Sequence, residues 1–487
     1  MWECGFFFVL QKSVRKMACS GALLSYIMPD MKNVLLLLLI CAAGLIAAES
    51  TVAPSAPAEA PAVAGVESRL NAVLQDMVKK NSEDFYEAAA LVYDDCGDVL
   101  TFFRLMTKAA ESGNPAAALW LSRYLSVQSA TNPELLTRAG TLLEGASAAG
   151  YVPAMVEYAG SVNMNEVEPS VKKKAMTALM NACRKGSAKG RALYLMVSGR
   201  MANGSITQPE IVSELKKKNY YLEEMIAAMQ PDTSSARVWM ERAAEHGSAF
   251  APFALYQVDS SEKSATYIQQ AVERHLPAAM GRYGTELVLR ETLDIEKCDD
   301  KKVAEGLRLL SMAVMMGDAV SYQMLAYLYA NGQGKNIPKE RIYELFQLAH
   351  RCGDPNGTAG VGYCKVLGVG CKQDAADGLA LMEKARDKNA QWVNQALASM
   401  YFNGDGVAPD LRKAVDALMD DHISGSRHAY AMMAVITAIG NASAKPDPST
   451  ARIYLNMAIE AGEADARLYY DSFVKEGKWR FMDELTR

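Results

Sequence analysis

Few residues of this sequence have the types and spacing that catalysis requires, and each candidate group lacks its partners. Ser213 and Lys216 show the Ser-x-x-Lys spacing in which serine β-lactamases place a nucleophilic serine and a lysine. The Ser-Asp-Asn and Lys-Thr-Gly motifs that complete this chemistry are absent from the chain. The glycine-rich run 357–362 lacks the Lys-Ser/Thr of a phosphate-binding loop and follows a helix stop, so it indicates close helix packing.

The histidines and cysteines do not form a recognisable metal motif. The chain contains no His-Glu-x-x-His, no histidine pair at helical spacing and no Cys-x-x-Cys. His246, His275 and His350 fall in the last turn of predicted helices, where an imidazole can bond unpaired carbonyl groups. We therefore expect no metal, no cofactor and no enzymatic activity. The alternative is a penicillin-binding or peptidoglycan-active enzyme that uses Ser213.

The N-terminal region indicates export. Residues 31–48 combine a short basic start, an apolar run over 34–46 and a small-residue cleavage site that ends at Ala48. The run is shorter than the roughly 20 apolar residues of a membrane-spanning helix, so we expect cleavage after Ala48, with an uncleaved membrane anchor as the alternative. We interpret 1–30 as an upstream extension that is not native and 49–65, rich in Ala and Pro, as a disordered linker. These features predict a periplasmic or secreted protein.

Export would place the remaining cysteines in an oxidising compartment. Cys364 and Cys371 lie on either side of one predicted interhelical loop and are a possible disulfide pair. The alternative is that most cysteines are buried and unpaired. Lipidation of Cys41 is disfavoured, because Ile40 stands where a lipobox needs Gly, Ala or Ser.

The composition is that of a folded protein without a basic surface. Half of the 487 residues are apolar and 22% are charged, which is unlike a disordered chain. The formal net charge of −5 argues against a nucleic-acid partner, which would need clustered Lys and Arg.

The strongest pattern in the chain is the spacing of glycines that end helices rich in small residues. They are Gly113, Gly150, Gly186, Gly247, Gly317, Gly353, Gly425 and Gly462. Several neighbours in this series are 36 or 37 residues apart, and Lys388-Asn389 stands where one glycine is missing. Between them, Ala, Leu and Met recur at helical spacing, and strand-like alternation is missing. A period of this size marks a stack of helix pairs.

One stretch, 398–414 (ASMYFNGDGVAPDLRKA), carries the pattern in full: small residues and Tyr on a first helix, then Gly404-x-Gly406-Val, then an acidic residue followed by Lys-Ala. Partial copies of its loop occur at Gly332-x-Gly334 and Gly368-x-Gly370. This layout resembles the Sel-one-like repeat family, a relative of the tetratricopeptide repeats. The resemblance implies an all-α fold, a right-handed α/α superhelical solenoid of about ten helix-turn-helix repeats, in which first helices line the concave side.

The repeat is irregular near its middle, because 61 residues separate Gly186 from Gly247. We assign the surplus to an inserted helix within 206–232, between N-terminal repeats over 66–205 and C-terminal repeats over 233–477, with a tail at 478–487. The next stop, expected near residue 275, has Leu276 in place of glycine. The candidate binding residues lie in the insertion and are Lys216, Lys217, Lys218, Tyr220 and Tyr221. The alternative is that this cluster is a solvated helix face.

Together these patterns predict an exported scaffold that binds a protein or peptide through its concave face and does not catalyse a reaction. The chain would meet a membrane only through an uncleaved signal segment. A membrane-anchored structural component of a bacterial envelope is a further alternative.

Overall fold

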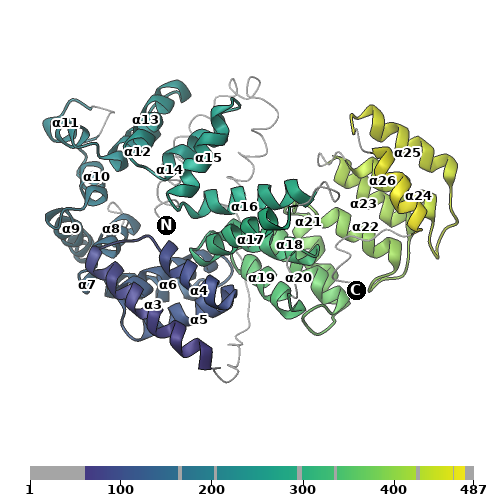
Figure 1. The fold of residues 1–487 in the computed structure, drawn as a ribbon, viewed down its shortest axis with the longest axis horizontal. Helices are drawn as coiled ribbons and strands as arrows, with labels where there is room; N and C mark the ends of the chain where they lie inside the picture. The colour runs from purple at the N-terminus through teal and green to yellow at the C-terminus, as the bar shows by residue number, and fades with distance from the viewer. Residues whose placement is uncertain are drawn as a thin grey trace. The chain divides into compact units, whose positions relative to one another are not determined.

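The computed structural model describes residues 61–162, 167–201, 206–292, 299–333, 337–423, 428–463 and 466–477. Within these ranges the chain forms 24 α-helices and no β-strand, which confirms the all-α prediction (Figure 1). None of the described helices combines the length and the apolar character that crossing a membrane requires. The predicted signal peptide and C-terminal tail lie outside the described residues. The predicted linker does not reach residue 65, because α3 already begins at Pro61, where a proline fits the first helical turn.

The described chain divides into two compact units, one that ends at Ser321 and one that begins at Tyr322. The first unit contains α3 (Pro61–Lys80), α4 (Tyr86–Cys96), α5 (Val99–Glu111), α6 (Pro115–Gln128), α7 (Glu134–Ala148), α8 (Val152–Ser161), α9 (Pro169–Arg184), α10 (Ala188–Val197), α11 (Pro209–Lys216), α12 (Tyr220–Ala228), α13 (Thr233–Glu245), α14 (Phe250–Val258), α15 (Lys263–Glu273), α16 (Pro277–Thr292) and α17 (Asp300–Met315). The boundary falls within α18 (Ala319–Ala330). The second unit continues with α19 (Lys339–Arg351), α20 (Pro355–Leu367), α21 (Ala375–Arg386), α22 (Val393–Asn403), α23 (Leu411–Ile423), α24 (Ala429–Ile439), α25 (Pro448–Glu460) and α26 (Ala466–Glu476).

Taken in chain order, the described helices α4 to α25 form eleven helix pairs, each with an even-numbered first helix and an odd-numbered second helix. Short helices of this kind cannot bury their apolar stripes alone, so the pairs within each compact unit pack on their neighbours. First helices also contact first helices, as α6 does with α8, and α10 with α12. The result is a solenoid, as the repeat period indicates.

The repeat glycines stand at helix ends in the left-handed backbone region, where a side chain is unfavourable. This holds for Gly113, Gly150, Gly186, Gly247, Gly317, Gly332, Gly353, Gly368, Gly370, Gly404, Gly406 and Gly462. Gly334 and Gly425 lie outside the described residues. At each second-helix stop that the structure describes, the amide of the left-handed residue and the amide that follows it donate to carbonyls in the last turn of the helix. For example, the amides of Gly353 and Asp354 donate to the carbonyls of His350 and Ala349.

Four residues other than glycine take the same backbone conformation: Asn81, Lys218, His275 and Asn389. Asn389 fills the position where a glycine is missing from the series. At the stop near residue 275, the left-handed residue is His275 and not Leu276, which the sequence pattern had suggested in place of glycine. The backbone bonds show the same arrangement, because His275 N–H donates to Val272 and Leu276 N–H donates to Ala271.

The middle of the array contains no single inserted helix. Residues 209–230, predicted as one helix within 206–232, contain all of α11 and all of α12, and the left-handed Lys218 separates the two helices. α11 serves as the second helix after α10, and α12 opens the next pair. Gly186, Lys218 and Gly247 then give steps of 32 and 29 residues, so two short pairs explain the surplus. The irregularity is a shortening of the repeat, and the two units meet at residue 321 and not near 205–232.

Within the first unit, residues far apart in sequence pack together. α17 contacts α4 and α5, and the buried indole N–H of Trp120 donates to the carbonyl of Met315 at 2.8 Å. Arg308 of α17 forms an ion pair with Asp94 of α4 at 3.2 Å. The first unit therefore curves far enough for its last helices to contact its first pair.

In the second unit, the glycine-rich run 357–362 lies inside α20, as close helix packing requires. A Cβ at Gly360 would lie 2.1 Å from the ring of Phe346, and one at Gly362 would lie 2.6 Å from the carbonyl oxygen of Gly378. These glycines let α19 and α21 approach the α20 backbone, and the run is not a nucleotide loop.

Candidate binding groove on the first helices

The connection between α3 and α4 lies over the ends of first helices in the first unit. Its residues Asn81–Asp84, which we call the acidic segment, are not helical. They adjoin a hollow of about 330 Å³, which we call the groove. The groove is lined by Asn81, Ser82, Glu83, Asp84, Val152, Pro153, Val156, Ser187, Ala188, Lys189 and Tyr221. Its walls are thus supplied by α8, α10 and α12, all of which are first helices.

Two cations from different first helices hold the Glu83 carboxylate. Arg123 Nη2 of α6 donates to Glu83 Oε2 at 2.6 Å, and Lys189 Nζ of α10 donates to Glu83 Oε1 at 2.6 Å. Only 16% of the Lys189 side chain and 27% of the Glu83 side chain are exposed. Burial alone would raise the pKa of Glu83, but Lys189 and Arg123 outweigh it and hold that pKa at about 2. Glu83 is therefore ionised at any physiological pH.

A second carboxylate fixes Arg123 in place. Glu157 of α8, whose side chain is only 3% exposed, accepts from Arg123 Nε at 2.8 Å and from Nη2 at 2.6 Å. The guanidinium thus lies between Glu157 on one side and Glu83 on the other. Because Glu157 belongs to the repeat framework, Arg123 is held ready for a carboxylate at the Glu83 position.

The other contacts of the acidic segment are hydrogen bonds to its backbone and its ends. The Tyr151 hydroxyl donates to the carbonyl oxygen of Ser82, and the Val152 amide donates to Asn81 Oδ1 at 3.2 Å. At the opposite end, Asp84 Oδ2 lies 2.8 Å from Nδ1 of His275. The His275 ring stacks on Tyr86, with centroids 3.7 Å apart. The segment is therefore held by five residues of the first unit: Arg123, Tyr151, Val152, Lys189 and His275.

Next to the groove, α12 carries a pair of buried acids. Glu223 lies 2.8 Å from Nδ1 of His246 and 3.2 Å from Arg242. Glu224 accepts a hydrogen bond from the Ser248 hydroxyl. Burial raises the pKa of Glu224 to about 7, although Ser248 and Lys189 act in the opposite direction. This pair ties α12 to α13 and to the start of α14.

The residues of the predicted binding cluster at the α11–α12 turn lie in two different environments. Lys216, Lys217 and Lys218 are exposed at the end of α11, and Lys217 pairs with Glu214 at 2.7 Å. Tyr220 and Tyr221 are half-buried and pack on each other, with ring centroids 4.2 Å apart. Tyr221 alone lines the groove, with Lys189 Nζ 5.7 Å from its ring centroid. The structure therefore brings the tyrosine to the groove and leaves the lysines on the turn.

Sequence reasoning did not find Glu83, Arg123, Lys189, Tyr151 or His275 as parts of one site. A signal for two of them exists, because Arg123 and Lys189 are basic residues on first helices that are otherwise mainly small and apolar. Their common partner is 40 and 106 residues away, respectively, and only the stacking of the repeats brings it near.

The other residues that the sequence offered for chemistry, Ser213, Cys364 and Cys371, do not line the groove. Ser213 is exposed on α11. Cys364 and Cys371, the possible disulfide pair, are both free thiols, and Cys364 is buried on α20. Burial raises the pKa of the Cys364 thiol, which disfavours the reactive thiolate. In the part of the chain that the structure describes, no three His, Cys, Asp or Glu side chains are placed to hold a metal ion.

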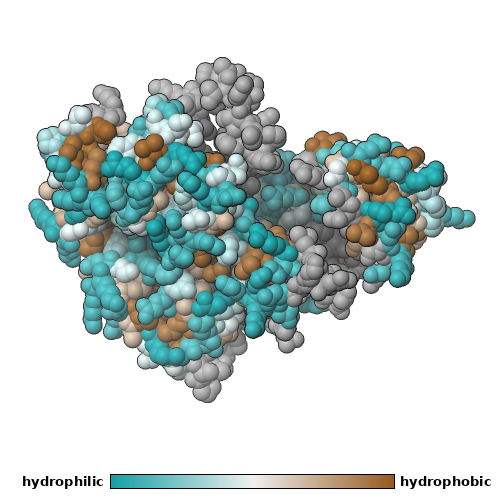
Figure 2. Space-filling model, turned by 45° about the horizontal axis from the view of Figure 1, so that its top comes forward, coloured by the Kyte–Doolittle hydropathy of each residue, from teal (hydrophilic) through white to brown (hydrophobic). Residues whose placement is uncertain are grey.

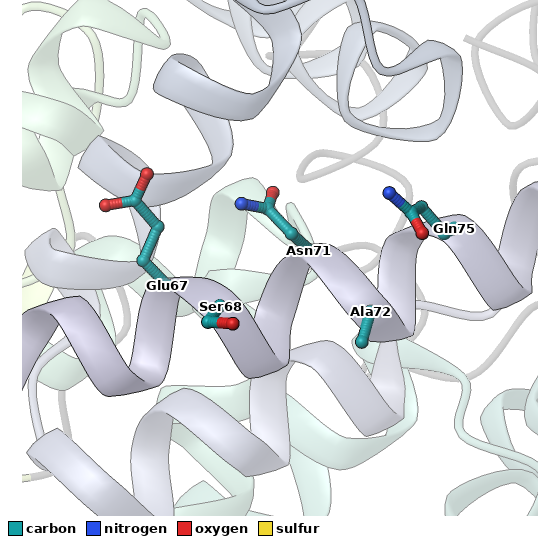
Figure 3. Close-up of a pocket in the computed structure, with 5 residues that line it drawn as sticks. All are labelled: Glu67, Ser68, Asn71, Ala72 and Gln75. Atoms are coloured by element: carbon teal, nitrogen blue, oxygen red, sulfur yellow. The ribbon is translucent and has the colours of Figure 1, made fainter.

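A second hollow, of about 460 Å³, lies along α3 (Figure 3). Its lining comes from a single helix and consists of Glu67, Ser68, Asn71, Ala72 and Gln75. Glu67 is already paired with Lys108 of α5 at 2.9 Å. A single helix does not enclose a ligand. Unlike the groove, this hollow therefore has no side chains that converge on one point.

The surface in the view of Figure 2 has hydrophobic residues only in small, separated patches.

The repeats can be compared with known families. The model of the family described as Sel1 repeat matches residues 227–248, 319–342, 355–389, 395–416 and 427–463. Five segments of the chain are thus similar to the Sel1 repeat. The matches fall on α13, on α18, on the pair α20–α21, on α22 and on the pair α24–α25. The Sel1 match at 395–416 covers the whole of the stretch 398–414 that carries the full sequence pattern, and this confirms the resemblance.

Two solved structures with this type of repeat are similar to the chain. One is a Sel1 repeat protein from Oxalobacter formigenes, with 18% identity, a TM-score of 0.24, and coverage of 76% of this chain and 90% of that one. The other is a protective antigen of uropathogenic Escherichia coli that displays an SLR fold, with 15% identity, a TM-score of 0.36, and coverage of 85% and 96%. No protein of curated function matches the sequence significantly.

Proposed function

We propose that this Sel1-repeat chain is an exported scaffold that binds another protein or peptide on the face formed by its first helices. Sel1 repeats generally mediate protein–protein interaction. The observation that carries the proposal is the groove, where side chains from α6, α8, α10 and α12 meet around a non-helical stretch of polypeptide. Export rests on the sequence of residues 31–48 and is part of the proposal.

A crosslinking pulldown from a bacterial envelope tests the binding face. Ala188 is half-buried and lines the groove, so Ala188→Trp fills the hollow without removing a charged contact. Thr177→Trp is a matched control, because Thr177 is exposed on the second helix α9. We expect a partner to be captured by the wild type and by Thr177→Trp and to be lost from Ala188→Trp. Equal capture by all three proteins would contradict a binding face on the first helices.

The absence of catalysis is also a proposal, and Ser213 is the residue on which it is tested. We expect no covalent labelling of residues 49–487 by a fluorescent β-lactam, because Ser213 is exposed on a short helix and the partner motifs are missing. Labelling that disappears in Ser213→Ala would establish the enzymatic alternative. Mass spectrometry of the exported protein decides between release and anchoring, since a mature start at Glu49 excludes an uncleaved anchor.

A further inference from the structure

We propose that the groove selects an extended acidic segment of a partner, with a carboxylate in the place of Glu83, and that Asn81–Asp84 is an internal occupant that the partner displaces. This inference rests on the proposed binding function and adds the chemistry of the ligand. It also implies that access to the groove is regulated, because a partner must first displace the internal segment.

The first argument is that the cationic side of the groove belongs to the repeats. Arg123 and Lys189 approach the same carboxylate from α6 and α10, two pairs apart, and each donates at 2.6 Å. Arg123 is fixed by Glu157, whatever occupies the groove. Two cations held by a rigid framework around one carboxylate position favour anionic ligands and exclude basic ones.

The second argument is that one contact reads the main chain. The Tyr151 hydroxyl bonds a main-chain carbonyl of the acidic segment, so this contact is available to any residue at the Ser82 position. The half-buried ring of Tyr221 lines the same groove, whereas Val152 and Val156 beside it are only 7% and 1% exposed. A longer partner segment would therefore find a further contact at Tyr221 beyond the carboxylate.

The third argument is that the acidic segment is anchored only by polar contacts. None of its four side chains is fully buried, whereas Phe85, which follows it, is 2% exposed. At the α3 end, Asn81 has a left-handed backbone, and the amides of Asn81 and Ser82 donate to the carbonyls of Val78 and Met77 in the last turn of α3. The segment can therefore leave the groove while Phe85 and the body of α3 stay packed, with the loss of these two bonds at the α3 end.

An internal occupant competes at high effective concentration, in the millimolar range for short connections, so a partner must displace it. Weakening the occupant should then strengthen binding of an external acidic peptide. We would measure this by fluorescence anisotropy with the purified full chain and a labelled peptide Asn-Ser-Glu-Asp-Phe-Tyr, blocked at both ends. The control peptide has Gln and Asn in place of Glu and Asp.

We expect weak binding of the acidic peptide to the wild type and at least about tenfold tighter binding to Glu83→Gln, as removal of an internal competitor implies. Adding Lys189→Met to that variant should abolish the gain, and the control peptide should bind none of the proteins. Asp84→Asn loosens the segment at its His275 end while both cations stay paired, and it should raise the affinity in the same direction. Glu111→Gln removes an acid from an exposed ion pair with Arg138 and should leave the affinity unchanged.

The proposal is overturned if Glu83→Gln and Asp84→Asn, each with the far-ultraviolet circular dichroism of the wild type, bind the acidic and control peptides equally. The acidic segment is then a permanent structural contact of the first unit and does not exchange with a ligand. The pulldown separates this result from failure of the scaffold function. A partner lost in Ala188→Trp but not displaced by the acidic peptide refutes the acidic ligand alone, whereas a pulldown without any groove-dependent partner refutes the proposed function.

Discussion

Replacing Glu83 by glutamine should destabilise the first unit, by an amount that follows from the charge environment of Glu83. The pKa of this carboxyl is about 2 in the folded chain, against an ordinary value of 4.5. At 1.36 kcal/mol per pKa unit the difference corresponds to about 3 kcal/mol, and screening at a side chain that is 27% exposed reduces it to roughly 2 kcal/mol. Part of the loss comes from Lys189, which would keep its charge without the Glu83 carboxylate.

The pH dependence has a definite sign. Because the folded pKa is lower than the unfolded pKa, the carboxylate stabilises the fold fully above about pH 4.5, and the contribution is lost as the pH falls toward 2. Less than half of it should remain at about pH 3, where the wild type and Glu83→Gln should become similar in stability.

Residue-resolved hydrogen exchange is the suitable assay, since a repeat array does not unfold as one cooperative unit. The free energies of opening for amides in α6, α8 and α10 should fall in Glu83→Gln at pH 7, while amides of the second unit stay unchanged. The control is Glu111→Gln, whose ion pair with Arg138 is more than half exposed on both sides and should contribute no more than about 0.5 kcal/mol. Equal losses in both variants, or a loss at pH 3 as large as the loss at pH 7, would refute the assignment of the stabilisation to the buried charge cluster.

Three further substitutions test the packing of the repeats, each by residue-resolved hydrogen exchange of the purified chain. Trp120→Phe removes the buried donor to the carbonyl of Met315 and should cost about 1–2 kcal/mol in the first unit, whereas no change would show that this bond does not stabilise the unit. Gly360→Ala places a Cβ 2.1 Å from the ring of Phe346 and should cost about 1–3 kcal/mol despite the better helix propensity of alanine; a more stable variant would contradict the close packing. Asp98→Ala removes the side chain that accepts from two amides at the start of α5 and should cost about 1 kcal/mol, and wild-type stability would exclude a capping role.

The sequence predicted the repeat because its stops depend on local chemistry. Glycine is favoured wherever a helix ends in the left-handed region, so a regular series of glycines reveals the series of helix pairs. The same reasoning failed at Lys218 and His275, since residues other than glycine can take this conformation at a modest cost and carry no sign of it in their type. Missing the stop at Lys218 led directly to the prediction of one long inserted helix.

The groove could be located only in general terms. The expectation that first helices form the binding face follows from the repeat architecture, and Tyr221 was among the named candidates. The charge cluster could not be derived, because Arg123 and Lys189 look like solvated residues until the curvature of the first unit brings the α3–α4 connection over them. A carboxylate partner 106 residues away leaves no local pattern.

The arrangement of rigid and exchangeable contacts limits what kind of partner can act here. A tetrapeptide that copied only Asn81–Asp84 would make the same bonds as the internal segment without its advantage of being attached, so it could not displace it efficiently. A productive partner must therefore add contacts that the internal segment does not make, and the half-buried ring of Tyr221, which lines the groove, is where a longer chain would make them. Specificity then requires both an acid at the cationic end and an apolar or aromatic residue beside it. Neither a purely acidic chain nor a purely apolar one would satisfy both.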